Sequence, residues 1–316
     1  MVINWKKIQT LREHYLALGQ DGSGDYWADQ ELVESYDAVL GARIAWKWTA
    51  VLERLQRDLE FRENVSVLDW GCGTAVASRE FFKYFASNIA QIYLYDRSQL
   101  VARFGQQKLL DQNAPVTIVP SMPNEKATIA LLSHVINEFN DASLVSLIDQ
   151  LIGHELIIWL EPGTHQESRN LGKVRSLLLD HYEVVAPCPK QSECPMFAFE
   201  NRAHWCHFFA KPPTEAFQSP VWTEASKNLG IDLRSLPTSF LCLKLKNSLK
   251  VSVRKKHIDG VLIGRPRIYK GYLKYLECHE NGLRENRLQK RDDKIMFKKL
   301  SGDVFLEFFG GEYSAN

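Results

Sequence analysis

Three cysteines in this 316-residue chain have a spacing that suits metal binding. Cys188, Cys194 and Cys206 follow one another as C-x5-C-x11-C, in segments rich in Pro and aromatic residues that show no helical period. Thiolates bind zinc and iron–sulfur clusters, and an ion that orders such a loop contributes to its folding. Disulfides are not expected in a reducing cytosol. The spacing differs from the C-x2-C of common zinc knuckles, and unrelated thiols are the alternative interpretation.

A fourth ligand could be local or remote. His204 and His207 flank the third cysteine, whereas Cys242 and Cys278 lie further along the chain. Cys242 falls within TSFLCLKLK and is interpreted as a buried strand residue. Cys278 comes just before a turn, ECHENG, which is a better position for a ligand. Zinc and an iron–sulfur cluster both remain open on the spacing alone.

A glycine turn, DWGCGT, separates a β-branched strand from a helix. Glycines let the backbone turn sharply and approach a ligand, and the helix N-terminus then offers free N–H groups. Asp96 ends the next strand, where a carboxylate can accept hydrogen bonds from ribose hydroxyls. The third small residue of the dinucleotide fingerprint is replaced by Val76, so NAD is disfavoured, although another nucleotide is an alternative. The D-x-G-x-G form resembles motif I of class I S-adenosylmethionine-dependent methyltransferases.

Side chains for catalysis are only weakly indicated. The segment SHVINE lacks the Asn/Asp-Pro-Pro-Tyr-like tetrapeptide with which amino-methylating enzymes orient a target nitrogen. Cys72 and Cys242 lie in a glycine turn and a strand interior, which are poor positions for a nucleophile. Glu161, at the end of a strand in LEPGT, could act as a base or could bind backbone groups. His134 is interpreted as structural.

The C-terminal part of the chain is strongly basic. Residues 254–299 contain 14 Lys and Arg against 6 Asp and Glu, a net charge of +8, whereas the rest of the chain sums to −7. Tyrosines interleave with the cations, a mixture that suits stacking on bases and contact with phosphates in single-stranded RNA. A merely solvated basic surface is the alternative. The residues predicted to contact RNA are Arg254, Lys255, Lys256, Arg265, Arg267, Tyr269 and Tyr272.

Strands alternate with helices over residues 61–250, which predicts an α/β domain with a Rossmann-like parallel sheet. Residues 1–60 are predicted to form a helical N-terminal region, because apolar residues from Val39 to Leu55 recur at spacings of three and four. The cysteines form a predicted metal-binding insertion at about 186–210. Residues 251–316 are predicted to form a small basic β domain whose short strands include KIMFKKL.

Bulk properties indicate an ordinary soluble protein, with 45% hydrophobic and 24% charged residues. No apolar run approaches the roughly 18 residues that a membrane-spanning helix needs. The start, MVINWKKIQTLREHYL, has neither the apolar core of a secretory signal nor the Ser- and Arg-rich character of a transit peptide. The sequence therefore predicts a cytoplasmic protein that does not associate with membranes.

Together these segments resemble a known family, the methyltransferase-like proteins of the mitochondrial small ribosomal subunit and their bacterial relatives. The similarity runs through about residues 65–290 and is carried by LDWGCGTAVAS, SHVINEF, EPGTHQESRNLGKVRSLLL, APCP…CP…WCHF, TSFLCLKL and RPRIYKGYLKYLECHENGLREN. The chain departs from the family at Lys190, where the family often has His, and in its N-terminal portion, which is shorter and different.

The resemblance implies a class I methyltransferase fold, S-adenosylmethionine as cofactor, and a four-cysteine [4Fe–4S] cluster. The implied cluster ligands are Cys188, Cys194, Cys206 and Cys278. The implied cofactor residues are Asp69, Gly71, Gly73 and Asp96. Asn137 and Glu138 fall where methyltransferases line the methyl-donor pocket.

The resemblance also implies association with the small ribosomal subunit or its rRNA. The expected function is an rRNA methyltransferase or a methyltransferase-derived assembly factor, monomeric when off the ribosome. A non-catalytic RNA-binding factor whose cluster senses iron or redox state is the alternative. A small-molecule methyltransferase is disfavoured, because it would not account for the basic C-terminal part.

Overall fold

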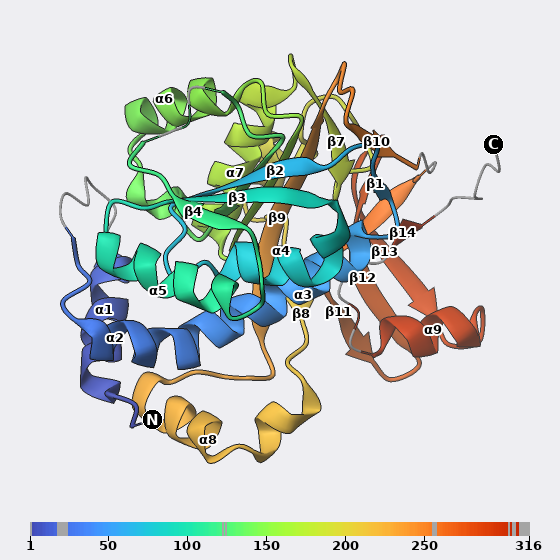
Figure 1. Cartoon of the computed structure of the whole chain (residues 1–316). Coiled ribbons are helices and arrows are strands. Elements are labelled where there is room, and N and C mark those ends of the chain that lie inside the picture. The colour runs from blue at the N-terminus through green and yellow to red at the C-terminus, as the bar shows by residue number, and fades with distance from the viewer. Residues whose placement is uncertain are drawn as a thin grey trace.

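The central feature of the fold is a mixed eight-stranded sheet with the order β4-β3-β2-β5-β6-β9-β7, in which β8 pairs with β9 (Figure 1). It is seen in a computed structural model that describes residues 2–17, 25–121, 123, 125–254, 258–302, 304 and 308–309. The strands are β2 (Val65–Trp70), β3 (Ile89–Tyr95), β4 (Val116–Ile118), β5 (Ile129–Ser133), β6 (Leu156–Pro162), β7 (Tyr182–Ala186), β8 (Phe208–Ala210) and β9 (Leu236–Leu245).

The strands from β4 to β6 are parallel, as the sequence predicts. The predicted parallel sheet is in fact mixed, because β9 is antiparallel to both β6 and β7. After β7 the chain passes through the cysteine segment and helix α8 (Pro220–Leu229) and re-enters the sheet in the opposite direction. An apolar run indicates that a strand is buried on both faces, but it does not indicate the direction in which that strand runs.

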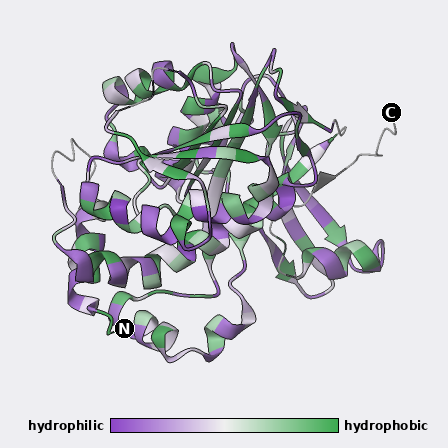
Figure 2. Cartoon of the chain, viewed as in Figure 1, coloured by the Kyte–Doolittle hydropathy of each residue, from purple (hydrophilic) through white to green (hydrophobic). Residues whose placement is uncertain are grey.

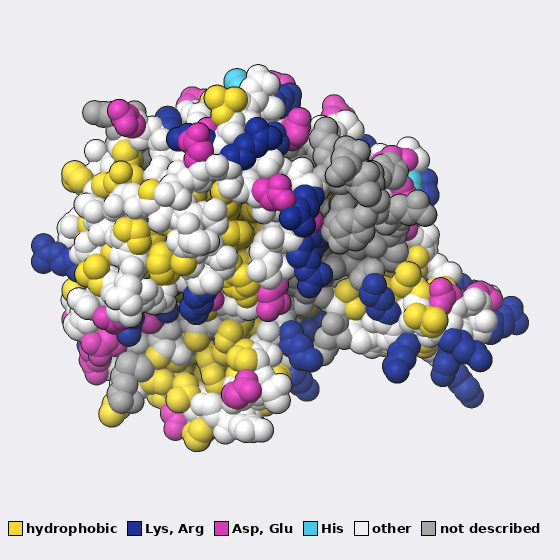
Figure 3. Space-filling view, turned by 45° about the vertical axis from the view of Figure 1, so that its right-hand side comes forward, with side chains coloured by type: hydrophobic (Ala, Val, Ile, Leu, Met, Phe, Trp, Pro, Cys, Tyr) yellow, Lys and Arg dark blue, Asp and Glu magenta, His cyan; other side chains and the backbone are white. Residues whose placement is uncertain are grey.

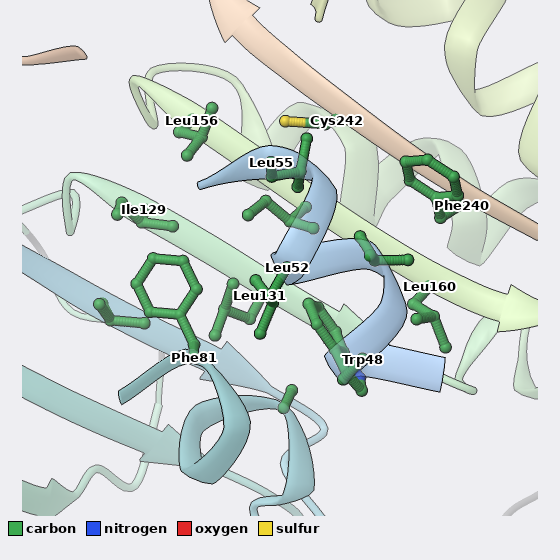
Figure 4. Packing of buried hydrophobic residues seen from close by; sticks show 14 of the residues in the cluster. Trp48, Leu52, Leu55, Phe81, Ile129, Leu131, Leu156, Leu160, Phe240 and Cys242 are labelled. Atoms are coloured by element: carbon green, nitrogen blue, oxygen red, sulfur yellow. The ribbon is translucent and has the colours of Figure 1, made fainter. Parts of the chain in front are cut away.

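Helices cover both faces of the sheet, because successive residues of each strand point to opposite sides. Ile129 and Leu131 pack with the helices of one face (Figure 4). Ala130 and Leu132 pack with the helices of the other face. The covering helices combine hydrophobic and hydrophilic residues (Figure 2). They are α3 (Ala42–Leu55), α4 (Val76–Phe85) and α5 (Gln99–Leu110) on the first face, and α6 (Asp141–Leu151) and α7 (His165–Leu178) on the second.

The described part of the N-terminal region is helical, as predicted. Helix α1 (Trp5–Ala17) packs against α2 (Gln30–Tyr36) and α8, and a π-helix η1 (Asp37–Gly41) leads into α3. Trp48 and Leu52 of α3 are completely buried against the central sheet, so this helix is part of the main core. Short 3-10 helices occur at η2 (Ala86–Asn88), η3 (Ile136–Glu138), η4 (Pro195–Phe197), η5 (Phe199–Asn201) and η6 (Thr214–Gln218).

The C-terminal part contains a separate antiparallel sheet with the order β13-β12-β11-β14. The prediction that KIMFKKL is a strand is wrong: it forms helix α9 (Lys294–Leu300), whose first turn is capped because Asp293 accepts a hydrogen bond from Met296 N. Leu300 is buried against Leu262 and Leu273. The strands are β11 (Gly260–Tyr269), β12 (Tyr272–His279), β13 (Gly282–Gln289) and β14 (Phe308–Phe309), and a two-stranded ladder joins β1 (Leu59–Phe61) to β10 (Val251–Val253).

Candidate functional site

The carboxyl ends of the parallel strands form one edge of the central sheet, and the chain connections diverge there. The chain runs from β2 to β3 and β4 on one side, then returns to β5 on the other side of β2. In open α/β sheets, ligands bind outside the carboxyl ends of the strands at such a switch point. The glycine turn after β2, Asp96 after β3 and the loop 134–138 after β5 all lie at this edge.

The glycine turn depends on two left-handed glycines. Gly71 has φ +63° and Gly73 has φ +51°, a region that L-residues avoid. A Cβ on Gly71 would lie 2.9 Å from Cγ1 of Val135, whereas a Cβ on Gly73 would meet no atom within 4 Å. Gly71 therefore allows close packing of the turn on the loop after β5, and Gly73 faces open space.

The two predicted carboxylates of this site differ in position. The half-buried Asp96 accepts hydrogen bonds from Gly73 N and Ser98 N, both at 2.9 Å, so it joins the turn to the start of α5. Asp69 is completely buried, and its Oδ2 accepts hydrogen bonds from Ser78 N (3.1 Å) and Ser78 Oγ (2.7 Å). Burial raises the pKa of Asp69 to about 7 and also raises the pKa of Asp96. Asp69 thus supports α4 from inside, and Asp96 lies at the edge.

Glu161, one of the weak catalytic candidates, anchors the loop after β5. Its Oε1 accepts hydrogen bonds from Val135 N and Ile136 N, both at 3.0 Å, and from Trp159 Nε1 at 2.6 Å. Its Oε2 has no hydrogen-bond partner among the described residues. Burial raises the pKa of Glu161 to about 8. This geometry suits a structural carboxyl group, and a role as a base stays a prediction.

The other two weak candidates lie in the 3-10 helix η3, at the same edge. Glu138 accepts hydrogen bonds from Tyr26 Oη at 3.0 Å and from Arg97, which directly follows Asp96. Burial raises the pKa of Glu138, against the opposing effect of Arg97. The structure therefore brings Asn137 and Glu138 beside the predicted cofactor residues, with Glu138 already engaged by two partners.

Sequence reasoning missed a buried lysine at this edge. Nζ of Lys47, on α3, lies 3.2 Å from Nε2 of His134, and burial lowers the pKa of Lys47 to about 7. His134 has φ +57°, which is uncommon outside glycine. Ser133 Oγ accepts a hydrogen bond from Trp48 Nε1 at 2.9 Å. The sequence offered one sign of this, because Lys47 directly precedes Trp48 in the amphipathic helix.

A second site lies where the central sheet, α7 and the C-terminal sheet meet. A cavity of about 40 Å³ there is lined by all four cysteines of the implied ligand set. They come from four places: Cys188 follows β7, Cys194 precedes η4, Cys206 precedes β8, and Cys278 lies on β12. Among the described residues, His204, His207 and Cys242 are not part of the cavity wall. Cys242 is completely buried in the main core (Figure 4).

The cavity combines thiols with a buried cation. Burial raises the pKa of Cys188, Cys206 and Cys278, and the Arg175 guanidinium opposes this effect at all three. Thiols with raised pKa values are protonated at neutral pH unless a metal displaces the proton. Within the ranges that the structure describes, no group of three or more His, Cys, Asp or Glu side chains is arranged to hold a metal ion. The metal ligands therefore stay predictions.

The predicted RNA-contacting tyrosines lie at the end of the β11–β12 hairpin. Tyr269 and Tyr272 stack with ring centroids 4.7 Å apart and planes 8° from parallel, and Arg287 lies 4.1 Å from the Tyr272 centroid. Arg267 is exposed and lies opposite Lys274 in the ladder. Lys and Arg side chains gather over this projecting part of the molecule (Figure 3). Cations and stacked rings therefore share one surface.

The remaining cations of the predicted RNA surface are less available. Arg265 lies 4.0 Å from the centroid of Phe209 and donates a hydrogen bond to Arg234 O at 2.6 Å. Arg254 forms an ion pair with Glu60 at 2.7 Å. Lys255 and Lys256 lie outside the described residues.

Comparison with known proteins places the chain in a family. The family model described as mitochondrial small ribosomal subunit Rsm22 matches residues 35–221, more than half of the chain. The chain belongs to this family, which confirms the resemblance drawn from its sequence. No curated protein matches it. Within the described ranges, no helix is long and apolar enough to cross a membrane.

Several solved structures that are similar to this chain are named as methyltransferases. The O-methyltransferase NcsB1 of neocarzinostatin biosynthesis, solved with S-adenosylmethionine, has 12% identity and a TM-score of 0.44 over 74% of this chain and 66% of its own. PH1948 from Pyrococcus horikoshii, described provisionally as an RNA methyltransferase, has 12% identity and a TM-score of 0.42 over 74% and 98%. A precorrin-6y C5,15-methyltransferase from Geobacter metallireducens has 13% identity and a TM-score of 0.37 over 63% and 87%.

Proposed function

We propose that this protein binds S-adenosylmethionine at the glycine turn and acts on the small ribosomal subunit or its rRNA. Membership of the Rsm22 family, whose description names the mitochondrial small ribosomal subunit, supports the second part. The single observation that carries the first part is the hydrogen bond from Gly73 N to Asp96, because it holds an open glycine and a ribose-binding carboxylate at one switch point.

The residues at the edge fit this cofactor. Gly73 leaves space where a Cβ would meet no atom within 4 Å, and α4 begins just beyond it, where the N-cap residue Ala75 makes no side-chain capping hydrogen bond. Asp96 would accept the ribose hydroxyl groups, and Asp69 would hold the turn in place. When bound, S-adenosylmethionine supplies an electrophilic methyl group. Asn137 and Glu138 would lie near it.

Calorimetry on the purified chain tests the cofactor proposal. We expect saturable binding of S-adenosylmethionine or S-adenosylhomocysteine to the wild type. Asp96→Asn should weaken it, since a neutral amide accepts hydroxyl hydrogen bonds less strongly than a carboxylate. Binding of neither ligand by the wild type would contradict the proposal. Incubation with small-subunit particles and a labelled methyl donor then tests for transfer.

The four cavity cysteines, in this proposal, hold a [4Fe–4S] cluster, with zinc as the alternative. The donor set supports it, because four thiols from separate segments line one cavity beside a buried arginine. Thiolates would bind the iron atoms, and the group would tie the C-terminal sheet to the cysteine segment through Cys278. Iron, sulfide and zinc analysis of protein purified without oxygen decides between the two: stoichiometric zinc without sulfide would contradict the cluster.

A non-catalytic RNA-binding role is the second candidate, and the state of the carboxylates favours it. Glu161 binds three backbone and indole N–H groups, and Glu138 is engaged by Arg97 and Tyr26. Glu161 is also completely buried, so neither carboxyl group can take a proton from a substrate without a rearrangement. Cofactor binding without methyl transfer to any small-subunit particle would favour this candidate. The cytoplasmic location and the monomeric state stay predictions.

A further inference from the structure

One face of α7 points at the thiol cavity. Ser168, Gly172 and Arg175 recur at spacings of four and three, so they share a face of the helix, and all three line the cavity together with the cysteines. Ser168 is 4% exposed and Arg175 is 2% exposed. Gly172 has no side chain between them. A helix face that presents a hydroxyl and a guanidinium to four thiols is unusual for a hydrophobic core.

The guanidinium of Arg175 is only partly satisfied by the protein. Its Nη2 donates hydrogen bonds to the carbonyl oxygens of Lys190 and Ser192, both at 2.8 Å. Its Nε and Nη1, and also Oγ of Ser168, are buried without a hydrogen-bond partner among the described residues. No described carboxylate forms an ion pair with it. A buried cation that lacks an anion is costly, so its position indicates a negative group in the cavity.

We infer that Arg175, helped by the Ser168 hydroxyl, stabilises the negative charge of the thiolate-ligated cluster and thereby raises its reduction potential; this rests on the cluster proposed above. Four thiolates outweigh the charge of the metal core, so the group is anionic. Reduction adds one electron and makes it more negative, while no bond to the protein forms or breaks. A buried cation and N–H or O–H donors to sulfur favour the reduced form, because net charge and hydrogen bonds to sulfur set cluster potentials.

Arg175 is therefore a positioning and tuning residue, and α7 supplies a matched control. Arg169 lies on the same helix and also binds the cysteine segment, since it donates hydrogen bonds to Met196 O (2.8 Å) and His204 O (3.2 Å). It is not among the residues that line the cavity. Removing Arg169 takes away a similar backbone anchor without taking positive charge from the cavity.

The test is a reductive titration of the anaerobically purified chain with dithionite, followed by electron paramagnetic resonance, with iron and sulfide measured in each sample. Arg175→Met should lower the reduction equilibrium constant at least tenfold relative to wild type, which is 59 mV for a one-electron couple. Arg175→Lys, which keeps the charge, should restore most of this change. Arg169→Met should leave the potential unchanged even if it retains less iron. Ser168→Ala should shift the potential in the same direction by less, and it keeps the inference testable if Arg175→Met cannot hold iron.

Several outcomes would overturn the inference. A potential that is unchanged in both Arg175→Met and Ser168→Ala would do so. A shift in Arg169→Met as large as the shift in Arg175→Met would also overturn it. The same holds if Arg175→Lys shifts the potential as much as Arg175→Met, because the potential would then depend on the backbone hydrogen bonds and not on the charge. A wild-type chain without iron and sulfide would refute the cluster itself, and the role of Arg175 with it. A full cluster whose potential ignores these substitutions would refute only the role of Arg175.

Discussion

Gly73→Ala is the substitution that separates ligand binding from folding at the glycine turn. Gly73 has φ +51°, and a Cβ there would meet no atom within 4 Å. Gly73→Ala should therefore lower the free energy of unfolding only by the strain of an L-residue in the left-handed region, about 1–2 kcal/mol, without a steric clash inside the protein. The added methyl group would instead project into the space that we assign to S-adenosylmethionine. Overpacking of a close-fitting site typically costs about 1–3 kcal/mol.

A matched control exists at Gly230, which ends α8. Gly230 has φ +61°, and a Cβ there would also meet no atom within 4 Å. Gly230→Ala should therefore destabilise the protein about as much as Gly73→Ala. Gly71→Val is a poor choice for this experiment, because a Cβ at Gly71 would lie 2.9 Å from Val135 and would disturb the turn itself.

The assay is calorimetric titration with S-adenosylmethionine and S-adenosylhomocysteine, beside thermal unfolding of each variant without ligand. We expect both variants to unfold at similarly lowered temperatures. Only Gly73→Ala should weaken binding, by roughly 5- to 150-fold, since about 1.4 kcal/mol corresponds to tenfold in Kd. Wild-type affinity in Gly73→Ala, or an equal loss in Gly230→Ala, would refute the placement of the cofactor at this turn.

Three further predictions concern the cysteines, a buried lysine and the basic hairpin. Serine at any of the four cavity cysteines should remove iron in metal analysis, whereas serine at Cys72 or Cys242, which lie outside the cavity wall, should not. Burial lowers the pKa of Lys47 to about 7, so between pH 7 and about 10 the unfolded chain binds more protons than the folded one and stability should rise with pH. The free energy of unfolding, measured with denaturant for the wild type and for Lys47→Met, should show this rise as a difference between the two proteins that grows by roughly 2–3 kcal/mol from pH 7 to 9. A difference that does not change with pH would contradict the prediction. Glutamate at Arg267 and at Lys270, an exposed residue of the turn between β11 and β12, should weaken binding of single-stranded rRNA and flatten its salt dependence, which is about −0.7 per phosphate contact in log–log form. Alanine at the two stacked tyrosines should weaken binding without changing this slope.

The sequence pattern was sufficient where local spacing determines structure. The apolar period in α3 and the alternation of strands with helices over residues 61–250 predicted elements that the structure contains, since these patterns follow from which face of an element is buried. The direction of β9 was not predictable, because its burial is the same in either direction. KIMFKKL was misread as a strand because seven residues are too few to separate the two periods, and the Asp293 cap was overlooked.

Some residues of the candidate sites could likewise be predicted from the sequence, and others could not. Three cysteines lie in one segment, so their convergence was visible in the sequence, whereas the place of Cys278 beside them depends on how the C-terminal sheet docks. Its position before a turn favoured Cys278 over Cys242, the resemblance to a family selected it, and the structure places it in the cavity wall. Arg175 and Lys47 were missed, because a charged residue in a helical pattern reads as exposed unless the packing of that helix is known.

Strand β12 connects the two sites that we propose for the C-terminal sheet. Cys278 near one end lines the cavity, and Tyr272 at the other end carries the stacked rings, about 20 Å away at ~3.4 Å per residue. Strand β12 pairs continuously with β13, and it pairs with β11 on both sides of an irregularity between Ile263 and Arg267. These backbone hydrogen bonds hold the strand in its sheet and need no metal. Loss of the cluster should therefore leave the hairpin folded and its phosphate contacts intact, while releasing one attachment of the sheet to the rest of the protein. Because Val261 and Ile263 remain packed in the main core, the sheet would stay docked with a less fixed orientation toward RNA.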